Sequence, residues 1–230
     1  LFSLIDKSKI LPLLKAGSYF FILQLSAVFM YQMGSILIAK FGSLSEVTQF
    51  NISYRYFNII FVGFVTMMNP LWTLCSQYFH IGKYEILKRY IKLYLLVFIV
   101  IVTILILQFF YFDKIISYWI GMKSIIYNEY IVFYVFIYTI ILSWNSLFIN
   151  VINGTGKVIL EMRLSLITII LFIPTVYFFA EFCNFKVYGV FIANIVFLSL
   201  FSVLMPIQVY YLLNNRGKNI WHKGVKSIDL

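Results

Sequence analysis

The chain has 230 residues, of which 63% are hydrophobic and only 11% are charged, and its formal net charge is +10. Soluble domains hold roughly 45–50% apolar and about 25% charged residues, so this composition excludes an ordinary soluble fold and indicates an integral membrane protein. The basic residues form short runs between apolar segments. That pattern is typical of membrane loops and argues against a nucleic-acid-binding protein.

Apolar runs of about 20 residues follow one another along the chain, and such runs favour helices over a β-barrel. We therefore predict an all-α integral membrane fold with six transmembrane helices. Residues 1–16, with Pro12 as a break, are expected to form an amphipathic cytoplasmic lead-in, and residues 214–230 a basic cytoplasmic tail. The six-helix lobe, residues 17–213, has predicted spans at about 17–39, 47–79, 93–112, 130–152, 162–180 and 187–213, joined by loops that include 40–46, 80–92 and 113–129.

The second predicted span is apolar enough to cross a membrane but carries strongly polar side chains. At 100° per residue, nearly all of them fall on one face roughly 100° wide. Such side chains need water or protein partners inside a bilayer, so we expect this face to line a wet cavity or to contact protein. The polar residues of the face are Asn51, Arg55, Asn58, Thr66, Asn69, Thr73, Ser76 and Gln77.

Arg55 is the one cation well inside a predicted span, since Arg163 lies at the very start of the fifth, and two interpretations are open. Its guanidinium faces a cavity and attracts a phosphate group, or it lies about 12 Å from the outer end of the helix and extends to the interface. The neighbouring Asn51, Asn58 and Asn69 favour the cavity. Pro70, inside the same span, is a candidate hinge, with a static kink as the alternative.

The fourth predicted span carries a second polar row, with spacings of four and three residues. Hydrogen bonding between helices is one explanation of the row, and lining of the same cavity is the other. Asn150 is the member that we take as a candidate binding residue. The row consists of Thr139, Ser143, Ser146, Asn150 and Asn153, and it ends in the turn signal NGTGK at 153–157.

The distribution of Lys and Arg predicts the orientation. The lead-in holds three such residues, the 80–92 connection four, the connection before the fifth span two when it is counted through Arg163, and the tail four, whereas the opposite side holds four in all. The positive-inside rule therefore places both termini in the cytoplasm.

The titratable residues do not form a catalytic pattern. His80 and His222 are isolated, and the eight carboxylates are expected in loops or at span ends. No metal-binding, Ser–His–Asp or Cys–His arrangement is present in the sequence. We therefore expect a non-enzymatic protein with no catalytic residues, metal ligands or cofactor, and with no carboxylate inside a span.

Three segments, LLKAGSYFFILQLSAVF, ILIAKFGSLSEVTQFNISYRYFNIIF and NPLWTLCSQYFHIGKYEILKRYIK, resemble the Wzx-type polysaccharide (O-antigen) flippases. NGTGKVILEMRLSLI and VYGVFIAN fit the same pattern. These flippases belong to the multidrug/oligosaccharidyl-lipid/polysaccharide exporter (MOP) superfamily, which includes the MATE multidrug exporters. The likeness covers nearly the whole chain, but only the C-terminal half of such a protein.

The resemblance implies one lobe of a MATE-like fold, in which two six-helix lobes surround a central cavity with alternating access. The implied cargo is an undecaprenyl-pyrophosphate-linked oligosaccharide, the repeat unit of an O-antigen, lipopolysaccharide or capsule. It would be moved across the bacterial inner membrane, from the cytoplasmic to the periplasmic leaflet. Membrane lipids, a glycan polymerase and other export components are the further implied partners. Arg55 would meet the pyrophosphate, with Asn51, Asn58, Asn69 and Gln77 beside it.

One departure from the family pattern concerns coupling to protons or sodium. Relatives often carry an Asp in the first of these spans, where this chain reads Gln32, Met33, Gly34 and Ser35. The lack of an intramembrane carboxylate also argues against a competing function, that of a MATE-like exporter of cationic drugs. Two more functions stay open. One is a membrane-embedded enzyme of glycan assembly, which would need a larger outer loop than 113–129, and the other is an inactive truncated fragment.

Overall fold

A computed structural model describes residues 7–120, 127–214 and 221. Every regular element in these residues is helical, and six helices are long and apolar enough to cross a membrane. The prediction of an all-α protein with six such helices is confirmed. The elements are α1 (Lys7–Phe41), α2 (Leu44–His80), α3 (Tyr84–Phe110), α4 (Phe112–Ile120), α5 (Glu129–Thr155), α6 (Ile159–Tyr177), the π-helical turn η2 (Phe178–Phe182) and α7 (Val187–Leu213).

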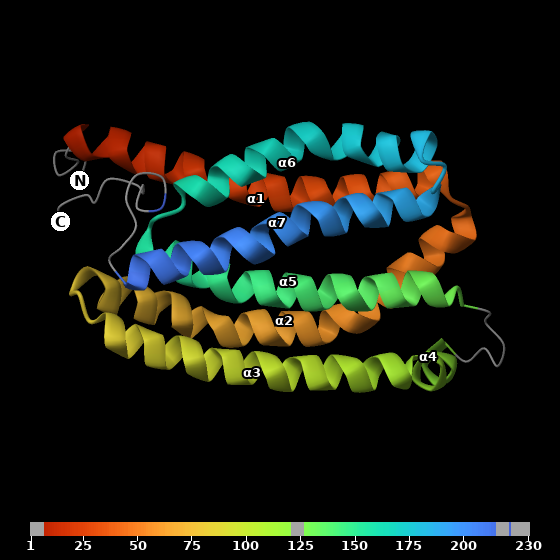
Figure 1. The fold of residues 1–230 in the computed structure, drawn as a ribbon, viewed down its shortest axis with the longest axis horizontal. Coiled ribbons are helices and arrows are strands. Elements are labelled where there is room, and N and C mark those ends of the chain that lie inside the picture. Colours follow the sequence, from red (N-terminus) through yellow and green to blue (C-terminus); the bar gives the residue numbers. More distant parts are fainter. Residues whose placement is uncertain (1–6, 121–126, 215–220, 222–230) are drawn as a thin grey trace.

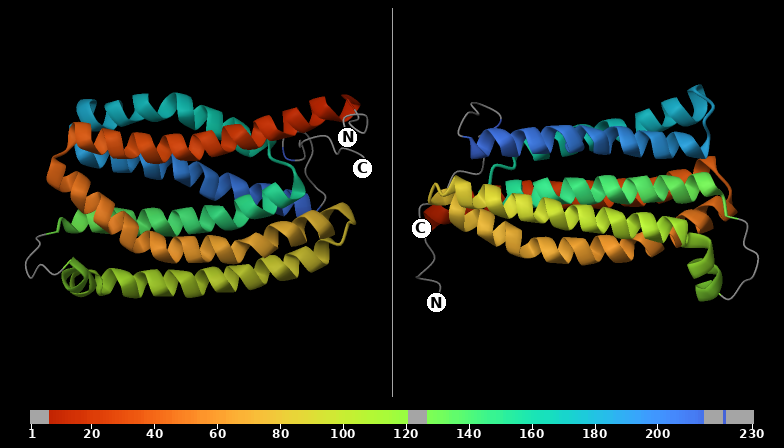
Figure 2. Two further views of the ribbon diagram at one scale, coloured as in Figure 1. Left: turned by 180° about the vertical axis from the view of Figure 1, so that it is seen from behind. Right: turned by 60° about the horizontal axis from the view of Figure 1, so that its bottom comes forward.

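The six long helices lie in two layers (Figures 1 and 2). One layer contains α1, α6 and α7, and the other contains α2, α3 and α5. α5 is central, because it packs against α2, α3 and α7, and its most apolar stretch is 56% buried. α3 lies at the edge, where only 11% of the corresponding stretch is buried, so most of its surface is available to lipid.

Several predicted loops are wrong. The connection 80–92 is mostly helical, since α3 begins at Tyr84 and carries Lys88, Arg89 and Lys92 on its first turns. A helix of 27 residues is about 40 Å long and exceeds a hydrocarbon core of roughly 30 Å, so its charged end can extend into the headgroups. Likewise, α1 continues through Pro12, where the sequence indicated a break, because one lost backbone bond does not end a long helix.

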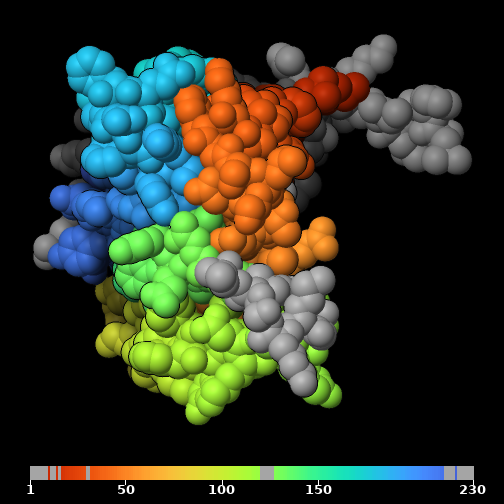
Figure 3. Space-filling view, turned by 90° about the vertical axis from the view of Figure 1, so that its right-hand side faces the viewer, coloured from red at the N-terminus to blue at the C-terminus, as the bar shows by residue number. Residues whose placement is uncertain are grey.

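The connection predicted at 40–46 is only two residues long, Gly42 and Ser43, because α2 has a strong start signal. The Ser43 side chain accepts a hydrogen bond from the backbone N–H of Glu46, and the Glu46 carboxylate accepts one from the backbone N–H of Ser43. This capping box begins the helix three residues earlier than the apolar run alone suggests. Figure 3 looks onto this end of the bundle, where the α1–α2 connection lies beside the start of α7.

α4 is an addition that the sequence did not predict, since 113–129 was expected to be a connection. In Figure 1 it is seen end-on while the six long helices run across the view, so it lies across the end of the bundle. Ile116 is fully buried, whereas Trp119 is 58% exposed, as expected of an aromatic residue at a membrane interface. Beyond α4, burial raises the pKa of Tyr127, and Asp113 raises it further.

Pro206 lies inside α7 and leaves the carbonyl of Ser202 without its usual helical donor. The indole Nε1–H of Trp144, on α5, donates to this carbonyl oxygen at 3.0 Å. The carbonyl group that Pro206 leaves without a helical donor is therefore hydrogen-bonded to α5. The bond from α5 favours a fixed backbone at this proline over a hinge.

Trp144→Phe is expected to lower the free energy of unfolding by about 1–3 kcal/mol, because the Ser202 carbonyl loses its donor in an apolar setting. In a Pro206→Ala background the same substitution should cost much less, because the introduced alanine supplies a backbone N–H to that carbonyl. Denaturant unfolding of the four purified variants measures the difference. Equal costs in the two backgrounds would show that the indole bond does not compensate for the backbone N–H that Pro206 lacks.

Candidate functional site

α2 packs against the bundle with one side and leaves the other uncovered. Phe57, Phe64 and Leu71 are fully buried on the packing side. On the helical wheel the predicted polar face lies roughly opposite these residues. The structure confirms that this face is not part of the core: Asn51 and Asn58 are half-buried, and Arg55, Thr66, Asn69, Thr73, Ser76 and Gln77 are exposed.

Two polar groups of this face bond within their own helix. Asn51 donates to the carbonyl oxygen of Val47 at 3.0 Å, and Thr66 donates to that of Val62 at 2.9 Å. Among the described residues, the one ion pair joins Lys88 to Glu85, so Arg55 has no carboxylate partner there. The guanidinium of Arg55 is therefore available to an anion from outside the bundle.

Pro70 is exposed on the same side of α2, and the helix continues on both sides of it, from Leu44 to His80. The structure thus places Pro70 beside the polar face. Whether the helix bends there during function stays a prediction.

The polar row of α5 lies away from the α2 face. Thr139 donates to the carbonyl oxygen of Val135, Ser143 to that of Thr139 and Asn150 to that of Ser146, each at 2.8 Å. These bonds stay within α5, so the expected bonding between helices is wrong for these three residues. Short polar side chains can satisfy themselves on the preceding turn of their own helix.

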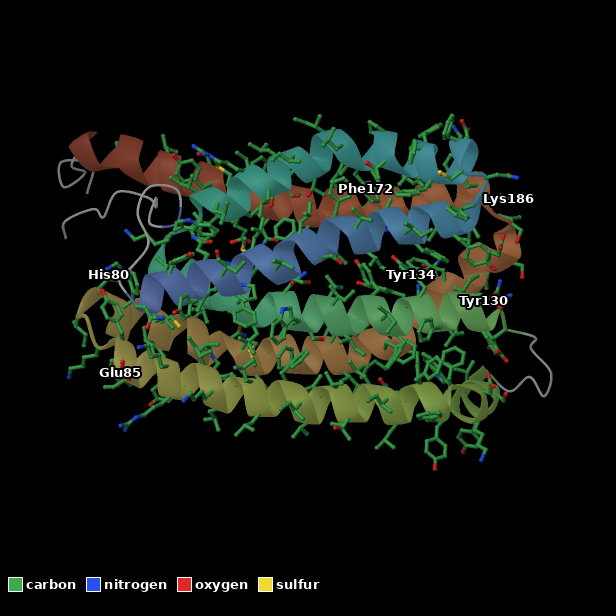
Figure 4. All side chains as sticks on the ribbon, in the orientation of Figure 1. His80, Glu85, Tyr130, Tyr134, Phe172 and Lys186 are labelled. Atoms are coloured by element: carbon green, nitrogen blue, oxygen red, sulfur yellow. The ribbon has the colours of Figure 1, made fainter. Side chains whose placement is uncertain are left out.

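Asn145, which lies off that row, makes the bonds between helices instead. It is 3% exposed, donates to the carbonyl oxygen of Leu198 at 3.1 Å and accepts from the hydroxyl of Ser202 at 2.8 Å. Both partners lie on α7, so Asn145 joins the two layers. Tyr134, labelled in Figure 4 on the same helix, stacks on Phe191 of α7 at a ring-centroid distance of 3.9 Å.

A cavity of about 290 Å³ lies between the two layers. α1 and α2 diverge from their connection, and α5 and α7 are seen between them in the left view of Figure 2. Of the α5 polar row, only Ser146 lines this cavity, and Asn150 does not. The lining consists of Leu23, Ser26, Ala27, Tyr54, Phe61, Tyr138, Leu142, Asn145, Ser146, Ile149, Glu161, Ser165, Leu198 and Phe201.

Glu161 is the unexpected member of this lining. It lies in the first turn of α6, is 5% exposed, and its Oε2 atom accepts no hydrogen bond. Next to it, the Ser26 hydroxyl of α1 donates to the carbonyl oxygen of Ser165 at 3.3 Å. Glu161 thus lies at the end of a span, as the sequence indicated, but it is buried in the bundle rather than exposed in a connection, because the fifth apolar helix begins at Ile159 rather than 162. The argument from a missing carboxylate against an exporter of cations therefore does not apply to this cavity.

A sequence signal for Glu161 does exist. Glu161, Ser165 and Thr168 follow one another at spacings of four and three residues, and all three are buried on one face of α6. A charge at the start of an apolar run is usually interfacial, so hydropathy alone assigns the residue to a connection.

The structure thus contains two separate polar features, the uncovered face of α2 with Arg55 and the cavity with Glu161. On the α2 wheel, Asn58 lies next to the cavity-lining residues Tyr54 and Phe61, so the two features adjoin. The described residues contain no group of three or more His, Cys, Asp or Glu side chains placed to hold a metal ion. In comparisons with known proteins, the chain matches no protein-family model, no curated protein and no solved structure.

Proposed function

We propose that this chain is the C-terminal lobe of a MATE-like flippase for an undecaprenyl-pyrophosphate-linked oligosaccharide, such as an O-antigen or capsule repeat unit. It would work by alternating access in a bacterial inner membrane, moving the cargo from the cytoplasmic to the periplasmic leaflet. Membrane lipids, a glycan polymerase and other export components would be its partners. The role is transport rather than catalysis.

The observation that carries this proposal is the uncovered polar face of α2. Polar and charged side chains at membrane depth face protein or water, because hydrocarbon offers them no hydrogen bonds. Arg55, Asn69 and Gln77 lie on the side of α2 that the other helices of the bundle leave open. A second lobe opposite this face would enclose a wet cavity between the two, as in the two-lobe arrangement that the family resemblance implies.

Arg55 would give the wet cavity between the two lobes a preference for negative charge. A guanidinium forms two parallel hydrogen bonds with phosphate oxygens, and these bonds are stronger where water is scarce. A pyrophosphate-linked lipid presents such oxygens beside its first sugar. Asn58 and Asn69 are on the same face and carry amide groups that can donate to sugar hydroxyls or phosphate oxygens.

The placement of charge along the bundle supports the proposed orientation of the protein in the membrane. The end where α2 meets α3 carries Lys83, Lys88, Arg89 and Lys92, near the labelled His80 and Glu85 of Figure 4. The opposite end, near the labelled Lys186, carries fewer basic residues. By the positive-inside rule the first end would lie in the cytoplasm, together with both termini.

Reconstitution of the complete wild-type protein in liposomes tests this function. The cargo is an undecaprenyl-pyrophosphate oligosaccharide with a fluorophore on the sugar, placed in both leaflets, and a membrane-impermeant reductant is added outside. Protein-free vesicles should lose only the outer-leaflet signal. Vesicles with the protein should lose nearly all of it, because flipping brings the inner-leaflet label outside.

The matched control is the same labelled oligosaccharide on undecaprenol without the pyrophosphate. Its inner-leaflet label should stay protected, since the neutral lipid gives Arg55 nothing to bind. If the inner-leaflet label of the pyrophosphate lipid stayed protected from the reductant, the proposed transport would be contradicted. If both lipids lost their inner-leaflet fluorescence equally, recognition of the pyrophosphate would be contradicted.

A further inference from the structure

We propose that the cavity between α1, α2, α5, α6 and α7 binds an organic ammonium ion with an apolar body, and that Glu161 is its counter-ion. This site goes beyond the flippase function, because it would take a cation, whereas the face around Arg55 would take an anion. The proposal rests on the carboxylate, on the charge of the lining and on the size and chemistry of the cavity.

The carboxylate is the first observation. Glu161 lines the cavity and is 5% exposed, and its Oε2 atom has no hydrogen-bond donor. A buried acceptor without a donor destabilises the fold, and natural structures rarely leave one without a reason. A ligand that donates to this oxygen would offset the cost.

The charge of the lining is the second observation. No Lys, Arg or His is among the described residues that line the cavity, and Glu161 is the one carboxylate among them. Arg163, two residues along α6, is exposed. A positive partner stabilises the charged form of a buried carboxylate, and the described lining supplies none, so a ligand that carries the positive charge fits this site.

The walls define the rest of the ligand. Four aromatic rings, those of Tyr54, Phe61, Tyr138 and Phe201, line the cavity together with Leu23, Leu142, Ile149 and Leu198. A volume of about 290 Å³ is far larger than a bare metal ion needs and is near the lower end of small-molecule pockets. Aromatic faces attract an ammonium group and pack against apolar carbon, so the lining fits an aromatic or alicyclic amine.

A matched series of ligands tests the proposal with the complete, purified protein. 2-(1-Naphthyl)ethylamine, 2-(1-naphthyl)ethanol and 1-naphthylacetate have similar apolar bodies and differ in the charge of the head. Isothermal titration, with protein-free micelles as the blank, should show the ammonium ion binding at least tenfold more tightly than the alcohol. The carboxylate should bind most weakly. Equal affinity for the three heads would overturn the proposal.

Glu161→Gln should abolish the preference for the ammonium ion while leaving the binding of the alcohol within about twofold, because the amide keeps the shape of the side chain and loses its charge. Glu181→Gln, an exposed carboxylate in η2, is the control and should bind like the wild type. An unchanged preference in Glu161→Gln would overturn the proposal. The proposal would also be overturned if sodium ions stabilised the protein in a way that depends on Glu161 and the amine did not.

A second variant keeps the test decisive if Glu161→Gln does not fold. Ala27 lines the cavity from α1 and is exposed rather than buried in the core, so Ala27→Phe should fill the space without disturbing the core. All three naphthyl ligands should then lose affinity. Undiminished binding of the ammonium ion in this variant would place its site elsewhere.

Discussion

Replacing Gly154 by Val is expected to lower the free energy of unfolding by about 3 kcal/mol or more. A Cβ at this position of α5 would lie 2.6 Å from the Cβ of Cys75 and 2.6 Å from the carbonyl oxygen of Trp72, both on α2. The neighbouring atoms belong to a helix backbone and a buried side chain, so they cannot move away at low cost. Small residues commonly allow such close approach between membrane helices.

Gly63→Ala is the matched control for this substitution. Gly63 lies in α2 and has no atom within 4 Å of the position that a Cβ would occupy. The alanine should leave stability unchanged or raise it by up to about 1 kcal/mol through helix propensity. Thermal unfolding of the detergent-purified variants, followed by circular dichroism, measures both effects. A Gly154→Val protein that melts with the wild type would contradict the close packing of α2 on α5.

Replacing Arg55 by Ala is expected to reduce glycan export about 10–100-fold, because a charge-assisted hydrogen bond to phosphate is worth roughly 1.5–3 kcal/mol. Arg55→Lys should retain part of the activity, since an ammonium group keeps the charge but cannot bind two oxygens with one planar group. The measurement is surface glycan in cells that depend on this protein, at matched protein levels.

Arg163→Ala serves as the control for Arg55, since Arg163 is also exposed but lies on α6, away from the polar face of α2. Its export should equal that of the wild type. Wild-type export by Arg55→Ala would remove the guanidinium from the mechanism and favour the second interpretation of Arg55, a side chain that only extends to the membrane interface.

The number and approximate positions of the long helices could be predicted because the hydrocarbon core of a membrane requires a span of a certain length and an apolar composition. The last span, 187–213, matches α7 to the residue, since charged or polar residues border it on both sides. Lys88 and Arg89 misled the prediction for α3, because charged residues inside a helix resemble a loop when only hydropathy is considered. α4 was missed because nine residues are too few for a span.

The candidate site was predicted in part. Helical periodicity alone placed Arg55, Asn58 and Asn69 on one face, and the structure leaves that face uncovered. Periodicity could not show that Asn150 bonds to its own helix at Ser146, nor that Asn145 bonds to α7, because both depend on how helices are rotated against one another. The prediction for Glu161 depended on where α6 begins, because the residue lies within three positions of that boundary.

The central claim is that the polar face of α2 meets water rather than lipid, and cysteine labelling tests it most directly. Thr66→Cys and Thr73→Cys lie on this face, whereas Val100→Cys lies on the exposed apolar side of α3. A Cys183→Ser background removes the partly exposed native thiol, and the other, Cys75, is fully buried.

Intact membranes are treated with a charged thiosulfonate reagent, and a lipid-soluble maleimide reports the total reactive thiol. The account predicts that the charged reagent labels positions 66 and 73 and leaves position 100 unlabelled, while the maleimide labels all three. A Thr66→Cys protein that resists the charged reagent as fully as Val100→Cys would show that the polar face is not wet, and would contradict the cavity on which the proposed function depends.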